Sequence, residues 1–231
     1  MSRDLPTDIP EEFKKEIRSD YIRMVIFGSG KSGKTHALTE FVIKAIHDQY
    51  DSFIVFTRSH NKPVYQMIFK KIKKPVQIII KDFRTNLKRV RALQEKNETT
   101  DTDPLGNPIY ASNVLIIWDD ILNKKLLASE EFLDQFSNMR HLQISTIMLT
   151  QVVNDVVTTG IKSNCNFTMI FKVKDLYQRR EMINMISESI EDDENFKSIK
   201  NKATKIYNDE IRRRKFGFVC LNEAGDIFFP N

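Results

Sequence analysis

Residues 28–35 combine three glycines with two lysines and three hydroxyl side chains. They read Gly-Ser-Gly-Lys-Ser-Gly-Lys-Thr and satisfy the spacing G-x-x-x-x-G-K-[ST]. Glycine allows positive φ angles, so peptide N–H groups can approach an anion closely. Lys34 adds a mobile positive charge for the β- and γ-phosphates, and Thr35 adds a hydroxyl oxygen of the kind that Mg²⁺ prefers. The loop Gly28, Ser29, Gly30, Lys31, Ser32, Gly33, Lys34, Thr35 is therefore predicted to bind a nucleoside triphosphate and Mg²⁺.

Two neighbouring carboxylates follow an apolar run at residues 114–118. We expect a buried strand there, ending in Asp119 and Asp120. Beside a phosphate loop, Asp119 is expected to hold Mg²⁺, and Asp120 to orient and deprotonate the attacking water. Strands also end in Asp where that residue caps a turn or helix. The catalytic interpretation of the acid pair therefore depends on the presence of the phosphate loop.

Gln151 follows another expected strand, at residues 145–150. An amide at this strand end could contact both the γ-phosphate and the attacking water. We predict that Gln151 senses whether ATP or ADP is bound. The alternative is an ordinary polar residue at a strand exit.

Apolar runs alternate with amphipathic segments along the chain, which favours an α/β fold with a mostly parallel sheet. A helix beginning at Thr35 has apolar residues at a helical spacing. Residues 97–113 contain two prolines and a glycine, which predicts a long loop. The expected strands are 24–27, 53–57, 76–80, 114–118, 145–150 and 167–173; the expected helices are 35–49, 129–139 and 176–190, with two more helices within 64–96; and a C-terminal hairpin is expected at 216–229.

The length of 231 residues suits one domain. We expect a polar extension at 1–20 and a single domain at 21–231, with a basic segment and the hairpin at 205–231. No apolar run approaches membrane-spanning length, and the N-terminus is not typical of a secretory signal. Two cysteines favour a reducing compartment, and the net charge of +5 is compatible with a nucleic-acid partner.

Three blocks of the sequence together resemble the FtsK–HerA superfamily of DNA-translocating ATPases. They are the glycine loop, the strand that ends in Asp119 and Asp120, and residues 140–164. The third block places Arg140 before the Thr-Gln strand end and has an Ile-Lys-x-Asn segment at 161–164. The short chain and the Asp-Asp pair look most like the poxvirus-type ATPases that package viral genomes. Cellular members usually carry Glu where Asp120 stands.

This resemblance implies a P-loop NTPase of the RecA/ASCE type, with core strand order 5-1-4-3-2. It implies ATP and Mg²⁺ as ligands and a ring of five or six subunits. An arginine from the neighbouring subunit would complete each site, with Arg140 as the first candidate and Arg180 as the second. The function implied is packaging of double-stranded viral DNA into a preformed capsid. The expected partners are DNA and a capsid vertex or internal membrane protein, and the expected location is the virion or host cytoplasm.

A packaging motor should grip the DNA backbone without reading its sequence, through lysine and arginine contacts to phosphate. Cations of the segment 81–91 are one candidate set. The second set, Lys124 and Lys125, follows the acid pair. The third set is the densest basic run of the chain and consists of Arg212, Arg213, Arg214 and Lys215. Solvated helix faces carry similar charges, so each set has that simpler interpretation.

Two other function classes remain open on the sequence. The basic run at 212–215 could form the arginine-rich lid of a nucleoside or nucleotide kinase. A nucleotide-dependent assembly scaffold with little turnover is the second alternative. A GTPase is not favoured, because residues 61–64 read Asn-Lys-Pro-Val and lack the final acid of the guanine-reading tetrad.

Overall fold

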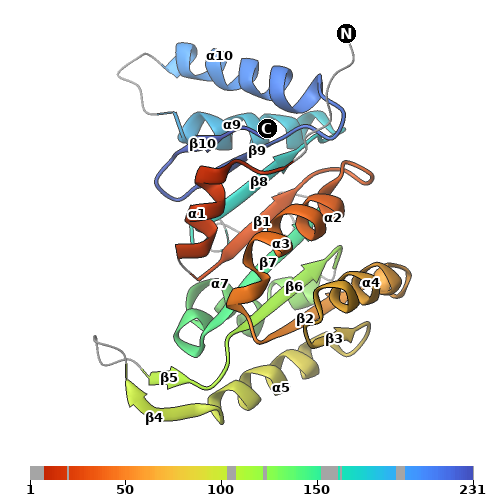
Figure 1. Ribbon diagram of the computed structural model, residues 1–231. Helices are drawn as coiled ribbons and strands as arrows, with labels where there is room; N and C mark the ends of the chain where they lie inside the picture. The colour runs from red at the N-terminus through yellow and green to blue at the C-terminus, as the bar shows by residue number, and fades with distance from the viewer. Residues whose placement is uncertain are drawn as a thin grey trace.

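The computed structural model describes residues 8–19, 21–102, 108–121, 124–151, 161, 163–190 and 196–230. Within these residues one large sheet runs through the molecule, with helices on both of its faces (Figure 1). The sheet has the order β10-β9-β8-β1-β7-β6-β2-β3. Its strands are β1 Arg23–Phe27, β2 Ser52–Thr57, β3 Val76–Ile79, β6 Val114–Asp119, β7 Ile144–Thr150, β8 Phe167–Phe171, β9 Phe218–Asn222 and β10 Ile227–Phe228.

The centre of this sheet, β8-β1-β7-β6-β2, has the expected order 5-1-4-3-2, and all of its strand pairs are parallel. The sheet differs from the expectation in being extended at both edges. β3 pairs in parallel with β2, and β9 and β10 add two antiparallel strands beyond β8. Because the central strands are parallel, their carboxyl ends meet at one edge of the sheet, and the glycine loop leaves β1 at that edge.

Two buried clusters lie on opposite faces of the sheet, because successive side chains of a strand point to opposite sides. One face is covered by α1, the helical segment after the loop, and α4; the other is covered by α5, α7, α9 and α10. The helices are α1 Glu11–Ser19, α2 Lys34–Ala37, α3 Ile43–Ile46, α4 Lys62–Ile72, α5 Phe83–Glu95, α6 Lys124–Leu127, α7 Glu130–Ser137, α9 Leu176–Glu188 and α10 Phe196–Ile206.

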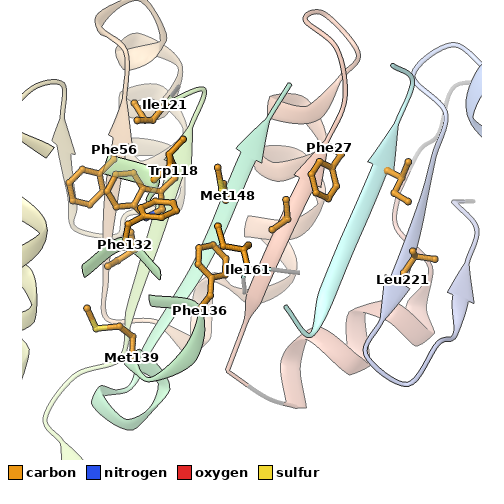
Figure 2. Packing of buried hydrophobic residues seen from close by; sticks show 14 of the residues in the cluster. Phe27, Phe56, Trp118, Ile121, Phe132, Phe136, Met139, Met148, Ile161 and Leu221 are labelled. Atoms are coloured by element: carbon orange, nitrogen blue, oxygen red, sulfur yellow. The ribbon is translucent and has the colours of Figure 1, made fainter. Parts of the chain in front are cut away.

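An aromatic stack holds the acid-tipped strand in place. Figure 2 shows Phe56, Trp118 and Phe132 side by side, and the rings of Phe56 and Trp118 are parallel with centroids 4.0 Å apart. The indole Nε1 of Trp118 donates to Gln135 Oε1 at 2.8 Å, so its polar atom is satisfied inside the core. This packing fixes the residue directly before Asp119.

The helix after the glycine loop is continuous from Lys34 to Gln49, but it is not α-helical throughout. A π-helical turn spans Leu38–Val42 between α2 and α3, and a 3₁₀ turn ends the segment at His47–Gln49. The hydroxyl of Thr39 donates to the Thr35 carbonyl at 2.8 Å, within this stretch. The predicted helix at 35–49 is therefore present in outline.

Three segments differ from the sequence-based expectations. Residues 97–113 contain a two-stranded hairpin, β4 Glu98–Thr102 with β5 Pro108–Tyr110, where we expected only a loop. β4 is polar and β5 has only three residues, so neither shows the apolar alternation that predicts a strand. The basic segment before the C-terminal hairpin, for which we predicted no secondary structure, begins in the last turn of α10 and continues as a π-helical segment at Tyr207–Arg212. The segment expected as a polar extension contains α1, whose Phe13 and Ile17 are fully buried against the sheet.

Two further observations concern the compartment and the membrane. No helix among the described residues is long and apolar enough to cross a bilayer. Cys165 and Cys220 are both free thiols, and burial raises the pKa of Cys165 to about 12.

Candidate nucleotide-binding site

The glycine loop is fastened to the two strands that flank β1. The N–H of Gly28 donates to the carbonyl of Thr150 at 3.2 Å, and that of Ser29 donates to the carbonyl of Lys172 at 3.0 Å. A side chain at Gly28 would place its Cβ 2.6 Å from both Phe171 Cβ and Ser32 Oγ, so the residue must be glycine. Gly33 has a φ of 104°, a conformation that other residues rarely adopt.

Two polar side chains inside the loop are placed to bind an anion. The Lys34 ammonium donates to the loop carbonyls of Gly28 and Ser29 at 2.6 and 3.1 Å. Burial lowers the pKa of Lys34, while Asp120 and Asp119 act in the opposite direction. The Ser32 hydroxyl is buried without a hydrogen-bond partner among the described residues. A phosphate in the loop would give the Ser32 hydroxyl a partner, and would give Lys34 an anionic partner in addition to the two carbonyls.

Asp119 is almost fully buried at the end of β6, with 3% of its surface exposed. Two side chains from the neighbouring strand end hold its carboxylate. The amide of Asn61 donates to Asp119 Oδ2 at 2.9 Å, and the Thr57 hydroxyl donates to the same oxygen at 3.4 Å. These contacts orient the carboxylate at the sheet edge where the loop lies.

Burial raises the pKa of Asp119 above its ordinary value, because an ionised carboxylate is poorly solvated at this depth. The neighbouring Asp120 raises it further, and Lys34 opposes the shift. The Tyr65 hydroxyl is buried beside the same carboxylate but without hydrogen-bond geometry to it. Burial and the charge of Asp119 raise the pKa of Tyr65 well above its usual range. A divalent cation beside Asp119 would favour its ionised form.

Asp120 and Gln151 meet at the ends of two adjacent strands. Gln151 Nε2 donates to Asp120 Oδ1 at 2.8 Å, and Asp120 has a φ of 55°. The other side of the Gln151 amide faces the glycine loop, since a Cβ at Gly30 would lie 3.4 Å from Gln151 Oε1. Gln151 thus links the second acid to the loop.

The donor set fits Mg²⁺ and a triphosphate. Thr35 and Asp119 offer hard oxygen atoms, which Mg²⁺ prefers, and the loop offers peptide N–H groups and Lys34 for phosphate oxygens. Among the described residues no cluster of histidine, cysteine and acidic side chains forms a complete metal cage.

The two arginine candidates lie at different ends of the sheet. Arg140 is exposed in a 3₁₀ turn, Met139–Leu142, just before β7 begins, whereas the loop lies at the far end of β7. Seven strand residues separate the two ends by roughly 20 Å, so Arg140 cannot serve the site of its own chain. Arg180 is exposed on α9, a helix that begins just after Lys174, whose N–H donates to Ser29 Oγ at 2.8 Å.

The expected DNA-contacting residues are spread over several surfaces. Lys125 is exposed on α6, while the side chain of Lys124 lies outside the described part. Arg212, Arg213 and Lys215 are exposed, but Arg213 and Arg214 form ion pairs with Asp209 and Glu210. On α5, Arg84 and Lys88 both pair with Glu131, and Arg91 pairs with Glu95 and Asp134. Within the resemblance block, residues 152–160 and 162 also lie outside the described part.

Sequence reasoning missed the residues that hold Asp119. Asn61 was considered only as part of a failed guanine-reading motif, and Thr57 only as a strand residue. The available signal was that β2 ends next to β6, so polar residues after β2 should meet Asp119. It also missed Phe216, whose side chain packs against Gly33 from the C-terminal segment.

The strand order, the glycine loop and the acid-tipped strand beside it define a P-loop ATPase. A model of the family described as "Poxvirus A32 protein" matches residues 11–221, and the chain belongs to that family. A comparison with curated protein sequences found no match.

Solved structures share this fold at low sequence identity. One is the genome packaging NTPase B204 from Sulfolobus turreted icosahedral virus 2 with AMPPCP: 15% identity, TM-score 0.59, covering 92% of this chain and 98% of B204. Another is B204, the DNA-packaging ATPase of Sulfolobus turreted icosahedral virus: 14% identity, TM-score 0.60, covering 93% and 100%. A third is EssC (ATPases 2 and 3) from Geobacillus thermodenitrificans: 12% identity, TM-score 0.53, covering 71% and 34%. At these identities the likeness shows the fold.

Proposed function

We propose that this protein is an ATP-driven translocase of double-stranded DNA that packages a viral genome into a preformed capsid. The observation that carries the ATPase part is the meeting of Asp119, Asp120 and Gln151 beside the glycine loop. The packaging part is supported by the poxvirus family and by the fold shared with B204, which is described as a genome packaging NTPase.

The chain's own residues supply the parts of a hydrolysis reaction. The loop amides and Lys34 bind the phosphates. Thr35 and Asp119 would hold Mg²⁺, which would supply positive charge to offset that of the phosphate oxygens. Asp120 accepts a proton from a water molecule whose oxygen forms a bond to the γ-phosphorus. The bond between that phosphorus and the β–γ bridging oxygen breaks, so ADP and phosphate leave. Gln151, hydrogen-bonded to Asp120, orients the water.

We propose that the active form is a ring of five or six subunits, with ATP between neighbours. The position of Arg140 supports this arrangement, because the residue lies far from its own site and is exposed. A guanidinium from the next subunit would stabilise the charge on the phosphoryl group in transfer. Arg180, on the helix beside the loop, is the second candidate for this role.

DNA would be held through phosphate contacts alone, since a packaging motor must pass any sequence. The α5 cations Arg84, Lys88 and Arg91 are already paired with α7 or with Glu95, which lowers their value as DNA contacts. Arg213 and Arg214 carry similar ion pairs, with Asp209 and Glu210. The candidates that remain are Lys81, Arg89, Lys124, Lys125, Arg212 and Lys215. The expected partner is a capsid vertex or an internal membrane protein, and the expected location is the virion or host cytoplasm.

One observation favours a nucleotide kinase as the second candidate function. The basic run at 212–215 leads directly into Phe216, which packs against Gly33 of the phosphate loop. A cationic segment in this place could act on a second phosphate substrate. Transfer of phosphate from ATP to a nucleoside or nucleotide, with no response to DNA, would establish that function. Slow turnover together with ATP-dependent assembly would instead indicate the scaffold.

The proposal is tested by measuring ATP hydrolysis with and without linear double-stranded DNA, alongside the mass of the oligomer. We expect DNA to stimulate hydrolysis severalfold, and Lys34→Ala to lower it by at least about 100-fold because the phosphates lose their point charge. The matched control is Lys44→Ala, which removes a surface lysine paired with Glu40 on the same helical segment. Hydrolysis by Lys34→Ala at the wild-type rate would contradict the proposal. An ATP hydrolysis rate of wild type that is the same with and without DNA would also contradict it.

A further inference from the structure

An aromatic cavity lies beside the phosphate loop and has no part in the chemistry above. Its volume is about 440 Å³. It is lined by Gly33, His36, Phe41, Phe171, Phe216 and Phe218, which come from the loop, the helical segment after it, β8 and the C-terminal segment. We call it the aromatic cavity. Figure 1 shows that β9 lies beside β8, which brings the C-terminal segment to this side of the molecule.

The cavity has a buried floor and an exposed rim. Phe171 and Phe218 are each 1% exposed, with ring centroids 5.0 Å apart, and Phe41 is nearly buried beside them. At the rim, Phe216 is 43% exposed. His36 is also exposed, and its ring lies edge-on to that of Phe41 with the ring centroids 5.5 Å apart. Flat, rigid rings at the mouth of an apolar hollow suit a flat aromatic ligand.

The aromatic cavity and the phosphate loop share Gly33. A Cβ at Gly33 would lie 3.3 Å from both Cβ and Cδ1 of Phe216, so the C-terminal segment touches the loop itself. His36 is the residue immediately after Thr35. A ligand whose phosphates lie in the loop therefore has the aromatic cavity as its neighbouring apolar space.

The backbone of Phe216 points to a role beyond packing. Its φ of 58° is in the left-handed region, where a bulky residue is strained. Lys215 places its ammonium 5.5 Å from the centre of the Phe216 ring, near the mouth of the cavity. Strain of this kind concentrates where a ligand is held, and it keeps a large apolar ring half-exposed beside a phosphate loop.

We propose that the aromatic cavity binds the base of the nucleotide, with Phe216 stacking on the base and Phe171 and Phe218 forming the floor. This rests on the proposed ATPase function, because it requires a triphosphate in the glycine loop. Stacking on an aromatic side chain contributes substantially to binding a base and is available to any base, since every base has a π-face. Phe216 would thus be a binding residue contributed by the C-terminal segment.

The test compares two ligands that differ in the presence of a nucleoside. Titration calorimetry with Mg²⁺ measures the affinity for a non-hydrolysable ATP analogue and for inorganic tripolyphosphate. We expect Phe216→Ala to weaken the analogue roughly 10- to 100-fold, as expected for loss of a stacking ring. We expect tripolyphosphate to bind with unchanged affinity, because it does not reach the cavity. Phe216→Trp should preserve binding of the analogue.

The matched control is Phe229→Ala, since Phe229 is 42% exposed but does not line this cavity. It should leave both affinities unchanged. If Phe216→Ala weakened both ligands equally, Phe216 would support the loop instead of the base, and the proposal would be wrong. Unchanged affinity for the analogue would also overturn it while leaving the ATPase proposal intact. If wild type bound neither ligand, both proposals would fail.

Discussion

Asp119 combines a proposed role in holding Mg²⁺ with a cost to stability. Its carboxylate lies at the buried end of β6, held by Asn61 and Thr57, and burial raises its pKa. In the absence of a cation, an ionised carboxylate at this depth is unfavourable. The roles of the loop and of the acid pair could be predicted from the spacing of these residues in the sequence. The residues that orient Asp119 could not, because only the three-dimensional pairing of β2 with β6 brings them there.

The first prediction concerns Asp119→Asn. Because the folded pKa is raised above the ordinary value of 3.8, the folded protein binds the proton more tightly than the unfolded chain. Stability therefore falls as pH rises from about 3.8 through the folded pKa, and the cost persists at neutral pH. The variant should be more stable than wild type at pH 7 without nucleotide. A gain of about 1 kcal/mol would raise Tm by roughly 2–4 °C.

Thermal unfolding at two pH values checks this prediction, with the exposed Asp101→Asn as the control. The gain should disappear below pH 3.8, where Asp119 is protonated in both states. The variant should also lose ATP hydrolysis, since it no longer offers Mg²⁺ an anionic oxygen. A lower Tm at pH 7 would show that the hydrogen bonds of the carboxylate outweigh its burial.

The second prediction concerns Gln151→Ala. Gln151 donates to Asp120 and lies against Gly30, so its loss should leave the water poorly oriented while the phosphate loop stays intact. We expect hydrolysis to fall by roughly 10²–10⁴-fold, the range for a positioned proton-transfer group. Affinity for a non-hydrolysable ATP analogue should change little. Equal losses in binding and turnover would assign Gln151 to the loop instead of the reaction.

At the scale of elements, the parallel centre of the sheet is the part that the sequence predicts well. Its strands are short and mostly apolar, because both of their faces are covered. β4 escaped prediction because it is polar and mostly exposed, and β5 because three residues are too few to show an apolar period. α1 escaped because its buried face consists of only a few residues in a charged helix.

The third prediction concerns α1, which belongs to the core. Phe13 is fully buried. Its ring centroid lies 5.6 Å from that of Phe167 and 5.3 Å from that of Phe228, so the helix packs against both β8 and β10. Phe13→Ala should lower the free energy of unfolding by about 3–5 kcal/mol through lost burial and the cavity left behind. Chemical denaturation measures this. Phe196→Ala, at a residue 72% exposed, should stay within about 0.5 kcal/mol of wild type. A similar small effect at Phe13 would mean that α1 is only loosely attached.

At the scale of the whole molecule, the glycine loop and Arg140 lie at opposite ends of the sheet. The proposed role of Arg140 therefore requires a second copy of the chain. The sequence predicted an arginine supplied by a neighbour only through its resemblance to ring-forming ATPases. The separation of the two ends is a consequence of the parallel β1–β7 pairing.

The fourth prediction is that Arg140→Ala subunits poison wild-type activity. If each site takes an arginine from its neighbour and the sites work in sequence, mixed rings should hydrolyse ATP far more slowly than the wild-type fraction suggests. Hydrolysis measured over a series of mixing ratios gives the curve. A linear decline with mutant fraction would remove Arg140 from this role. The same series with Arg180→Ala then tests the second candidate.

The most direct test of the central claim is movement along DNA. A short third strand bound at one end of a linear duplex is displaced when a motor arrives, and its release can be followed in time. We expect release to require ATP and Lys34, and to begin later as the duplex is lengthened. Steady ATP hydrolysis with the third strand left in place at every length would contradict the account.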